Sequence, residues 1–197
     1  VGLFGLRGLA GMPPIVIDPS DQEVGSEGSI ASIVSQSVEA NRTIFLNHPG
    51  PDRIRRNKVG LIVIVTDFIG SGGRVRAILD KMMATPSVRS WRANRWIDFA
   101  VVAAAGTNVG IAHALRHRVA PMLHVTHVVP TLDTFHDQGL VAEWMELFST
   151  YGPRNARGAG PTGYNENGAL VALSYRTPNN VPLILNADDR NWRALFR

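Results

Sequence analysis

The strongest constraint on the fold is an uninterrupted apolar run over residues 61–65, Leu-Ile-Val-Ile-Val, in which four of the five residues are β-branched. Such a run is typical of a strand buried on both faces, as in a parallel sheet. It leads through Thr66 and Asp67 into a turn of three glycines and one serine at residues 70–73. Residues 75–83 then have the apolar spacing of a helix. The order of strand, small-residue turn and helix predicts an α/β domain.

The chemistry of this turn suits an anion. The backbone N–H groups at the start of a helix favour a phosphate above all. Glycines let the backbone approach a ligand closely, and Ser71 adds a hydroxyl donor. Asp67, at the end of the strand, offers a carboxylate to sugar hydroxyls. The pattern therefore predicts a sugar-phosphate site, and the alternative is an ordinary structural turn of an α/β protein.

The same stretch resembles the phosphoribosyl pyrophosphate (PRPP) signature of type I phosphoribosyltransferases, a hydrophobic strand followed by two acids, two apolar residues and a small-residue loop. The resemblance implies that Asp67 holds the ribose hydroxyls. It also implies a 5-phosphate loop made of Ile69, Gly70, Ser71, Gly72, Gly73 and Arg74. Thr66 stands where the first acid is expected. Because a threonine brings no charge to a magnesium-bound ribose or to an oxocarbenium-like transition state, this departure favours ligand binding over full catalytic power.

A second candidate region precedes the central strand. The stripe of Ile30, Ile33, Val34 and Val38 predicts a helix that begins near Ser26. In the transferase family a loop before an early helix handles the pyrophosphate, and Gly25 and Ser26 are the nearest candidates in position. The alternative is that Ser26 only caps the helix.

The rest of the chain repeats strand and helix patterns. We expect strands over 98–105, 121–129 and 169–175, an edge strand over 181–185, and helices over 109–118 and 141–151. For residues 1–23 we expect an irregular entry segment with a short strand at 15–17. A length of 197 residues fits one domain of ordinary size. The fold class that follows is a single α/β domain over 1–197, with a mostly parallel sheet, helices on both faces and a type I phosphoribosyltransferase-like fold.

Three further groups of side chains leave alternatives open. His113 and His117 are four residues apart, a spacing that metals use, but without a third ligand nearby a solvated basic helix face is favoured. His136 and Asp137 could serve acid–base chemistry or cap the following helix. The glycine-rich segment 152–168 is long for a loop, and such length is typical of functional or disordered segments. Its Arg157 is a candidate pyrophosphate contact.

Composition limits the partners. The net charge of +4 and a pI near 10.1 suit phosphorylated ligands and permit weak nucleic-acid contact. The basic run at 53–58 is either a solvated helix face or a contact with a polyanion. No cysteine is present, which excludes disulfides and zinc–thiolate sites and fits a cytoplasmic protein. No apolar run reaches the roughly 20 residues of a membrane span. The first residue is valine, so we expect a part of a longer protein.

The tail narrows the resemblance. Residues 24–197 resemble the phosphoribosyltransferase-like domain of prokaryotic conflict and defence cassettes, including some retron anti-phage systems. The likeness lies in Gly25-Ser26-Glu27, the glycine loop, the turn Thr177-Pro178-Asn179-Asn180, and Trp192 with Leu195-Phe196-Arg197. It implies binding of PRPP or a nucleotide, with Mg²⁺ carried by PRPP, and transfer or removal of a phosphoribosyl group. The alternative is a non-catalytic nucleotide-sensing module that regulates a partner protein.

Overall fold

The computed structural model describes residues 1–5, 26–152, 160–174, 177–188 and 192–196. Within these residues, five strands form one parallel sheet in the order β2-β1-β3-β4-β5. The strands are β1 (Gly2–Gly5), β2 (Leu46–Asn47), β3 (Leu61–Ile69), β4 (Asp98–Thr107) and β5 (Met122–Val129). The predicted α/β class with a parallel sheet is confirmed, whereas the organisation as one domain stays a prediction.

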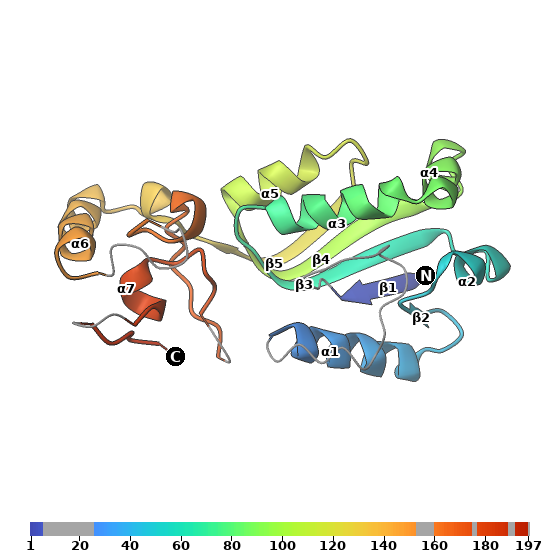
Figure 1. Ribbon diagram of the computed structural model, residues 1–197, viewed down its shortest axis with the longest axis horizontal. Coiled ribbons are helices and arrows are strands. Elements are labelled where there is room, and N and C mark those ends of the chain that lie inside the picture. Colours follow the sequence, from blue (N-terminus) through green and yellow to red (C-terminus); the bar gives the residue numbers. More distant parts are fainter. Residues whose placement is uncertain (6–25, 153–159, 175–176, 189–191, 197) are drawn as a thin grey trace.

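Helices cover both faces of this sheet, as Figure 1 shows. Helix α1 (Ser26–Ala40) lies against one face, and α3 (Gly73–Ala84), α4 (Pro86–Ala93) and α5 (Asn108–Leu115) lie against the other. Helix α2 (Pro51–Arg56) lies near the start of β3. We call this unit, residues 1–5 and 26–129, the sheet part.

The alternation of β3 explains why its sequence carries no polar face. Ile62 and Ile64 pack in the cluster under α3 and α4, while Val63 and Val65 pack with Ile30 and other residues of α1. The side chain of Ile64 is fully buried, and such burial contributes about 1.5–3 kcal/mol. Both faces of β3 are therefore covered, as the apolar run predicted.

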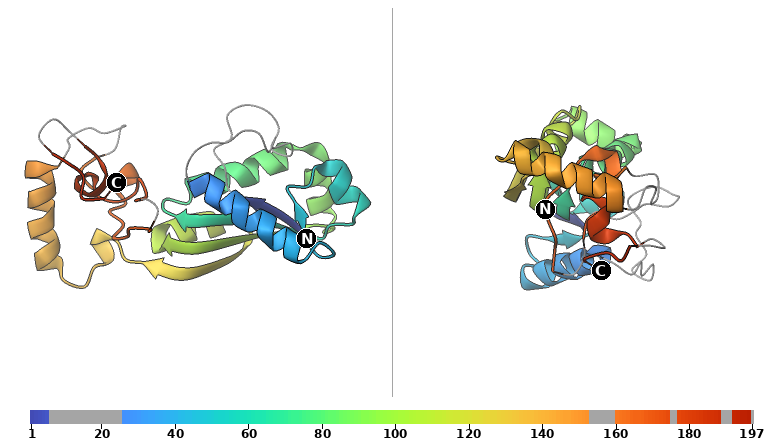
Figure 2. Two further views of the ribbon diagram at one scale, coloured as in Figure 1. Left: turned by 90° about the horizontal axis from the view of Figure 1, so that it is seen from below. Right: turned by 90° about the vertical axis from the view of Figure 1, so that its left-hand side faces the viewer.

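The chain continues from β5 into a second unit beyond the carboxyl ends of the strands (Figures 1 and 2). It contains η1 (Leu132–Thr134), α6 (Gln138–Tyr151), η2 (Tyr164–Glu166) and α7 (Leu183–Asn186). Its apolar cluster includes Leu132, Val141, Phe148 and Ile184. We call the described residues from 130 onward the C-terminal part. Its position places it across from the turn that follows β3.

The start of the chain differs from the expected irregular entry segment. Residues 2–5 form β1, which pairs with β2 on one side and β3 on the other. Leu3 and Phe4 are buried in this interior strand. The short strand expected at 15–17 lies outside the described residues. Glycines at both ends of β1 conceal a strand in the sequence, because glycine disfavours strands unless tertiary pairing overrides it.

Two strands expected near the end of the chain are wrong. The described residues of the predicted strand 169–175 do not join the sheet. Ala169 makes only an isolated β-bridge to Thr131. The segment expected as an edge strand over 181–185 instead contains α7, whose Leu183 and Ile184 are buried. Short apolar runs fit a strand or a buried helix equally well, and here the packing against α6 decides.

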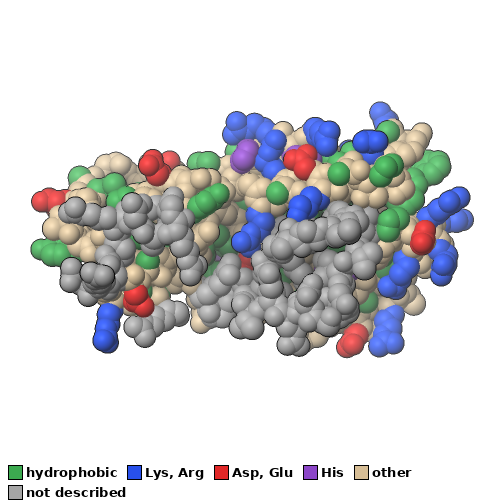
Figure 3. All heavy atoms as spheres, in the orientation of Figure 1, with side chains coloured by type: hydrophobic (Ala, Val, Ile, Leu, Met, Phe, Trp, Pro, Cys, Tyr) green, Lys and Arg blue, Asp and Glu red, His purple; other side chains and the backbone are tan. Residues whose placement is uncertain are grey.

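The side-chain alternatives are partly resolved. Asp137 caps α6, since its carboxylate accepts a hydrogen bond from the Leu140 N–H at 3.0 Å. The expected solvated face is wrong for His117, which is buried and lies 3.1 Å from the Asp80 carboxylate. The basic run is exposed on and just after α2, and Figure 3 shows further Lys and Arg side chains over the helices of the sheet part. No helix in the described part of the chain is both long and apolar enough to cross a membrane.

Candidate functional site

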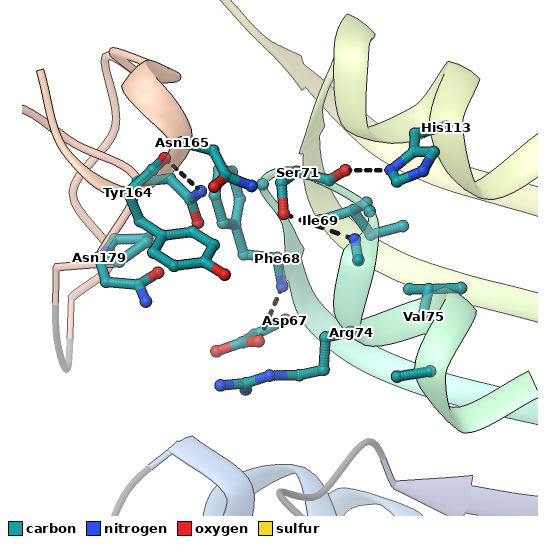
Figure 4. Close-up of a pocket in the computed structure, with 16 residues that line it drawn as sticks. Asp67, Phe68, Ile69, Ser71, Arg74, Val75, His113, Tyr164, Asn165 and Asn179 are labelled. Carbon is teal, nitrogen blue, oxygen red and sulfur yellow. Dashed lines mark hydrogen bonds between the residues drawn. The ribbon is translucent and has the colours of Figure 1, made fainter. Parts of the chain in front are cut away.

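A pocket of about 480 Å³ lies at the carboxyl end of β3 (Figure 4). The sheet part lines it with residues 67–75, and the C-terminal part lines it with Tyr164, Asn165 and residues 178–180. The sheet order reverses between β1 and β3, because the chain moves outward to β2 and then returns to add β3 on the other side. In open parallel sheets, ligands bind at such a switch point, outside the carboxyl ends of the strands.

The turn after β3 has the conformation that its glycines allow. Gly72 has a φ of +75°, in the left-handed region, and a Cβ added there would overlap the carbonyl oxygen of Gly110. Among the described residues, the backbone N–H groups of Ser71 and Gly72 have no hydrogen-bond acceptor. The Gly73 N–H contacts the Ser71 hydroxyl at 3.4 Å. The start of α3 thus offers backbone donors to an anion.

Helix α5 fixes this turn in place. The Thr107 hydroxyl donates to the carbonyl of Gly70 at 2.6 Å and accepts from the Gly110 N–H at 3.0 Å. Nδ1 of His113 lies 2.8 Å from the carbonyl oxygen of Ser71. Because a carbonyl only accepts, this nitrogen carries the proton. The turn is therefore held by two buried hydrogen bonds and one exposed hydrogen bond before any ligand arrives.

Asp67 lies inside β3 and is 7% exposed. Its Oδ1 accepts hydrogen bonds from the Phe68 N–H at 2.8 Å and from the Thr66 hydroxyl at 3.3 Å. Asp67 lines the pocket, and Figure 4 shows Arg74 beside it. Thr66 does not line the pocket. At the place of the expected first acid, this threonine orients the neighbouring carboxylate and does not face the ligand space.

The structure brings the central group of predicted site residues together. Asp67 and the six residues of the predicted phosphate loop, 69–74, line one pocket. Gly25 and Arg157 lie outside the described residues. Ser26 is the first residue of α1, but its side chain is not described. The pyrophosphate contacts therefore stay predictions, as do the roles of the loop residues.

Several residues of the pocket were not predicted from the sequence. Tyr164 and Asn179 face Asp67 and Arg74 across it (Figure 4), and His113 completes one rim. Asn180 is buried, donates to the Tyr164 carbonyl at 3.3 Å, and packs so closely on Gly70 that a Cβ there would overlap it. The sequence feature that could have pointed to Asn179 and Asn180 was the turn at 177–180, which no general rule of α/β folds requires.

The described residues do not form a metal cage. Among them, no group of three or more His, Asp or Glu side chains could hold a metal ion. Of the carboxylates in the described ranges, Asp67 alone lines the pocket. This donor set fits a magnesium ion that is held mainly by the oxygens of a bound pyrophosphate.

A family model for PRTase-CE matches residues 15–197 of the chain. The chain belongs to the PRTase-CE family. This is a family of phosphoribosyltransferase-like domains, so the resemblance seen in the sequence is confirmed at that level. No curated protein and no solved structure matches the chain. The PRTase-CE assignment supports a phosphoribosyltransferase-like function.

Proposed function

We propose that this PRTase-CE domain binds PRPP, or a nucleotide with the same ribose 5-phosphate group, in the pocket at the end of β3. One observation carries the proposal: the glycine turn and Asp67 converge on a single pocket at the switch point of the sheet. A phosphate needs several donors, whereas a ribose diol needs an acceptor. The pocket presents both within one short segment.

Each part of the ligand has a matching group. The 5-phosphate contacts the amides at the start of α3 and the Arg74 guanidinium, since charge-assisted hydrogen bonds to phosphate are the stronger ones. The ribose hydroxyls donate to the Asp67 carboxylate, which Thr66 and the Phe68 N–H hold in orientation. Tyr164, which is 45% exposed, offers an aromatic ring on the opposite wall.

The reaction that this arrangement suits is displacement at C1 of the ribose. A ring nitrogen of a base, or a water, forms the new bond to C1 while the bond to the pyrophosphate oxygen breaks. Pyrophosphate leaves with the electron pair, and the nucleophile releases its proton. Asp67 and the turn hold the ribose 5-phosphate while C1 reacts. Magnesium, carried with the pyrophosphate, supplies charge neutralisation.

Calorimetry with PRPP and Mg²⁺ tests the site. We expect Asp67→Asn to weaken binding by about 10- to 150-fold, because hydrogen bonds to a charged group contribute roughly 1.5–3 kcal/mol. Asp52→Asn is the matched control, since Asp52 is exposed on α2, away from the pocket. Equal affinities for the wild type and Asp67→Asn would remove the assignment.

A second candidate function is a non-catalytic sensor that binds the same ligand and regulates a partner protein. The observation that favours it is that the described residues supply the pocket with one carboxylate, Asp67. Thr66, which stands where a second acid is expected, is turned to Asp67. Release of pyrophosphate from PRPP, measured with a panel of bases and with water alone, separates the two. Turnover supports the transferase or hydrolase, and binding without turnover supports the sensor.

The resemblance of the tail extends the proposal to anti-phage defence in the cytoplasm, with a protein partner from the same cassette. The Thr-Pro-Asn-Asn turn supports it, since Asn179 and Asn180 line the pocket and tie this feature to the ligand site. Plating of phage on cells that express the complete cassette tests it. Protection that survives Asp67→Asn would separate defence from ligand binding.

A further inference from the structure

A second pocket, of about 220 Å³, adjoins the first and is built from a different set of groups. Asn165 lines both pockets. Within the η2 turn, Tyr164 lines the first pocket and Glu166 lines the second. The turn thus forms the wall between them, and a ligand that fills the first pocket has the second within reach.

The second pocket is rich in hydrogen-bond acceptors. Asp133, Glu166 and Asn167 line it, together with the apolar side chains of Val109, Leu132 and Met145. Among the residues that the structure describes, no Lys, Arg or His side chain lines it. Its volume lies below the roughly 300–1,000 Å³ of sites for drug-sized ligands, so it suits a group of about the size of one base.

One acceptor in this pocket lacks a partner. Oδ1 of Asn167 is buried and makes no hydrogen bond within the described residues. A buried polar atom without a partner is rare in native proteins and requires an explanation. This oxygen has almost no solvent-accessible surface, so a bound donor reaches it only when the Asn167 side chain turns toward the pocket. The Glu166 carboxylate likewise has no hydrogen bond or ion pair among the described residues, whereas Asp133 accepts one from the Thr131 hydroxyl.

The backbone holds these acceptors in an uncommon conformation. Asn165 and Glu166 have φ values of 54° and 52°, in the left-handed region, and Gly168 follows at 57°. A Cβ at Gly168 would meet the side chain of Leu132. Left-handed backbone is uncommon for a glutamate, and such conformations cluster at ligand sites.

We propose that the second pocket selects a base with two adjacent N–H donors, as in guanine, for the ligand bound in the first pocket. The inference rests on the proposed function. The Glu166 carboxylate accepts from the ring N1–H and the 2-amino group in a two-pronged contact, and Asp133 adds negative charge nearby. When the Asn167 side chain turns toward the pocket, its Oδ1 accepts the remaining amino hydrogen. The apolar residues cover the ring. A base that presents carbonyl oxygens at this edge meets the carboxylates unfavourably.

Three ligands test the selectivity: ribose 5-phosphate, GMP and IMP, where GMP differs from IMP only by the 2-amino group. We expect calorimetry to show GMP binding about 5- to 150-fold more tightly than IMP, since a correct two-pronged base contact discriminates by that factor. Glu166→Gln should bring the two affinities within about twofold and leave ribose 5-phosphate binding unchanged. Asp133→Asn should act in the same direction with a smaller effect.

The control is Glu143→Gln, which removes the same charge from an exposed position on α6 that does not line the pocket. It should preserve the preference for GMP. If the wild type binds ribose 5-phosphate but binds GMP and IMP equally tightly, the base assignment is overturned and the proposed function stays intact. Failure of ribose 5-phosphate to bind would overturn both.

Discussion

The two pockets on either side of the η2 turn differ in the balance of their hydrogen-bonding groups. The pocket at the end of β3 offers backbone N–H donors and Arg74 beside the Asp67 carboxylate. The smaller pocket offers two carboxylates and the unpartnered Oδ1 of Asn167. An anionic group fits the first and is repelled by the second, while a group of N–H donors fits the second. Under the proposals above, one ligand with two unlike ends fills both pockets.

The two parts also differ in charge, though less than the two pockets do. Residues 1–129 hold 14 Lys or Arg and nine Asp or Glu, whereas residues 130–197 hold six Arg and seven Asp or Glu. Figure 3 shows Lys and Arg side chains spread over the helices of the sheet part. The positive net charge of the chain therefore comes from its first 129 residues, and it favours an anionic group on that side.

The two pockets also differ in how their backbone is held. Buried contacts from Thr107 and Gly110 brace the glycine turn against α5. The η2 turn instead contains two consecutive non-glycine residues with positive φ, Asn165 and Glu166, and each costs roughly 1–2 kcal/mol. The phosphate side is therefore the more firmly preorganised of the two, and it should dominate affinity.

The largest effect is expected at Gly72. Gly72→Ala places a Cβ in the left-handed region and against the Gly110 carbonyl, so unfolding should become easier by about 1–2 kcal/mol or more. Displacing two amide donors should weaken PRPP binding by roughly 100-fold. Thermal unfolding and calorimetry measure the two effects.

The matched control for Gly72 is Gly60→Ala. Gly60 does not have positive φ, and a Cβ there meets only the Trp96 carbonyl oxygen at 3.9 Å. This variant should bind PRPP as the wild type does. If Gly72→Ala also binds as the wild type does, the turn does not hold the phosphate, and the contrast between donor and acceptor pockets fails.

A coupling free energy, smaller than the combined effect of Gly72→Ala on stability and binding, should reveal the contact between the two parts. Gly70→Ala forces a methyl group into the Asn180 side chain, and overpacking of this kind typically costs 1–3 kcal/mol. Asn180→Ala removes the obstacle together with the donor to the Tyr164 carbonyl. The double variant should therefore be less destabilised than the sum of the single variants, with a coupling of about 0.5–3 kcal/mol in urea unfolding. Strict additivity would mean that the two parts do not meet at Gly70.

The central site could be predicted because its signals are local. The apolar run, Asp67 and the glycine turn are consecutive in the chain, so their order alone specified a strand, a turn and a helix that the structure contains. Thr66 was the exception. Its role depends on a hydrogen bond to the neighbouring carboxylate, and residue identity does not reveal in which direction a side chain points.

The C-terminal part could not be predicted in the same way. The strand expected at 169–175 and the edge strand at 181–185 failed because short apolar runs take their structure from tertiary packing, here against α6. Tyr164 and Asn179 reach the pocket from residues distant in sequence from Asp67. Interior strand β1 was hidden for a related reason, because Gly2 and Gly5 have little intrinsic tendency to form strands.

The smallest effect is expected at the basic run on α2. Arg55 and Arg56 are exposed near the start of β3, whereas the pocket lies at its other end. A nine-residue strand spans roughly 30 Å, about three times the screening length at moderate salt. Arg55→Gln with Arg56→Gln should therefore leave PRPP affinity within about twofold. Any salt-sensitive gel shift with nucleic acid should weaken in the same variant, because that contact would depend on these charges.

Arg89→Gln, on the exposed surface of α4, is the single-charge control. A tenfold loss of PRPP binding in the α2 variant would show that the basic surface, and not only the groups in the pocket, attracts the anionic end of the ligand.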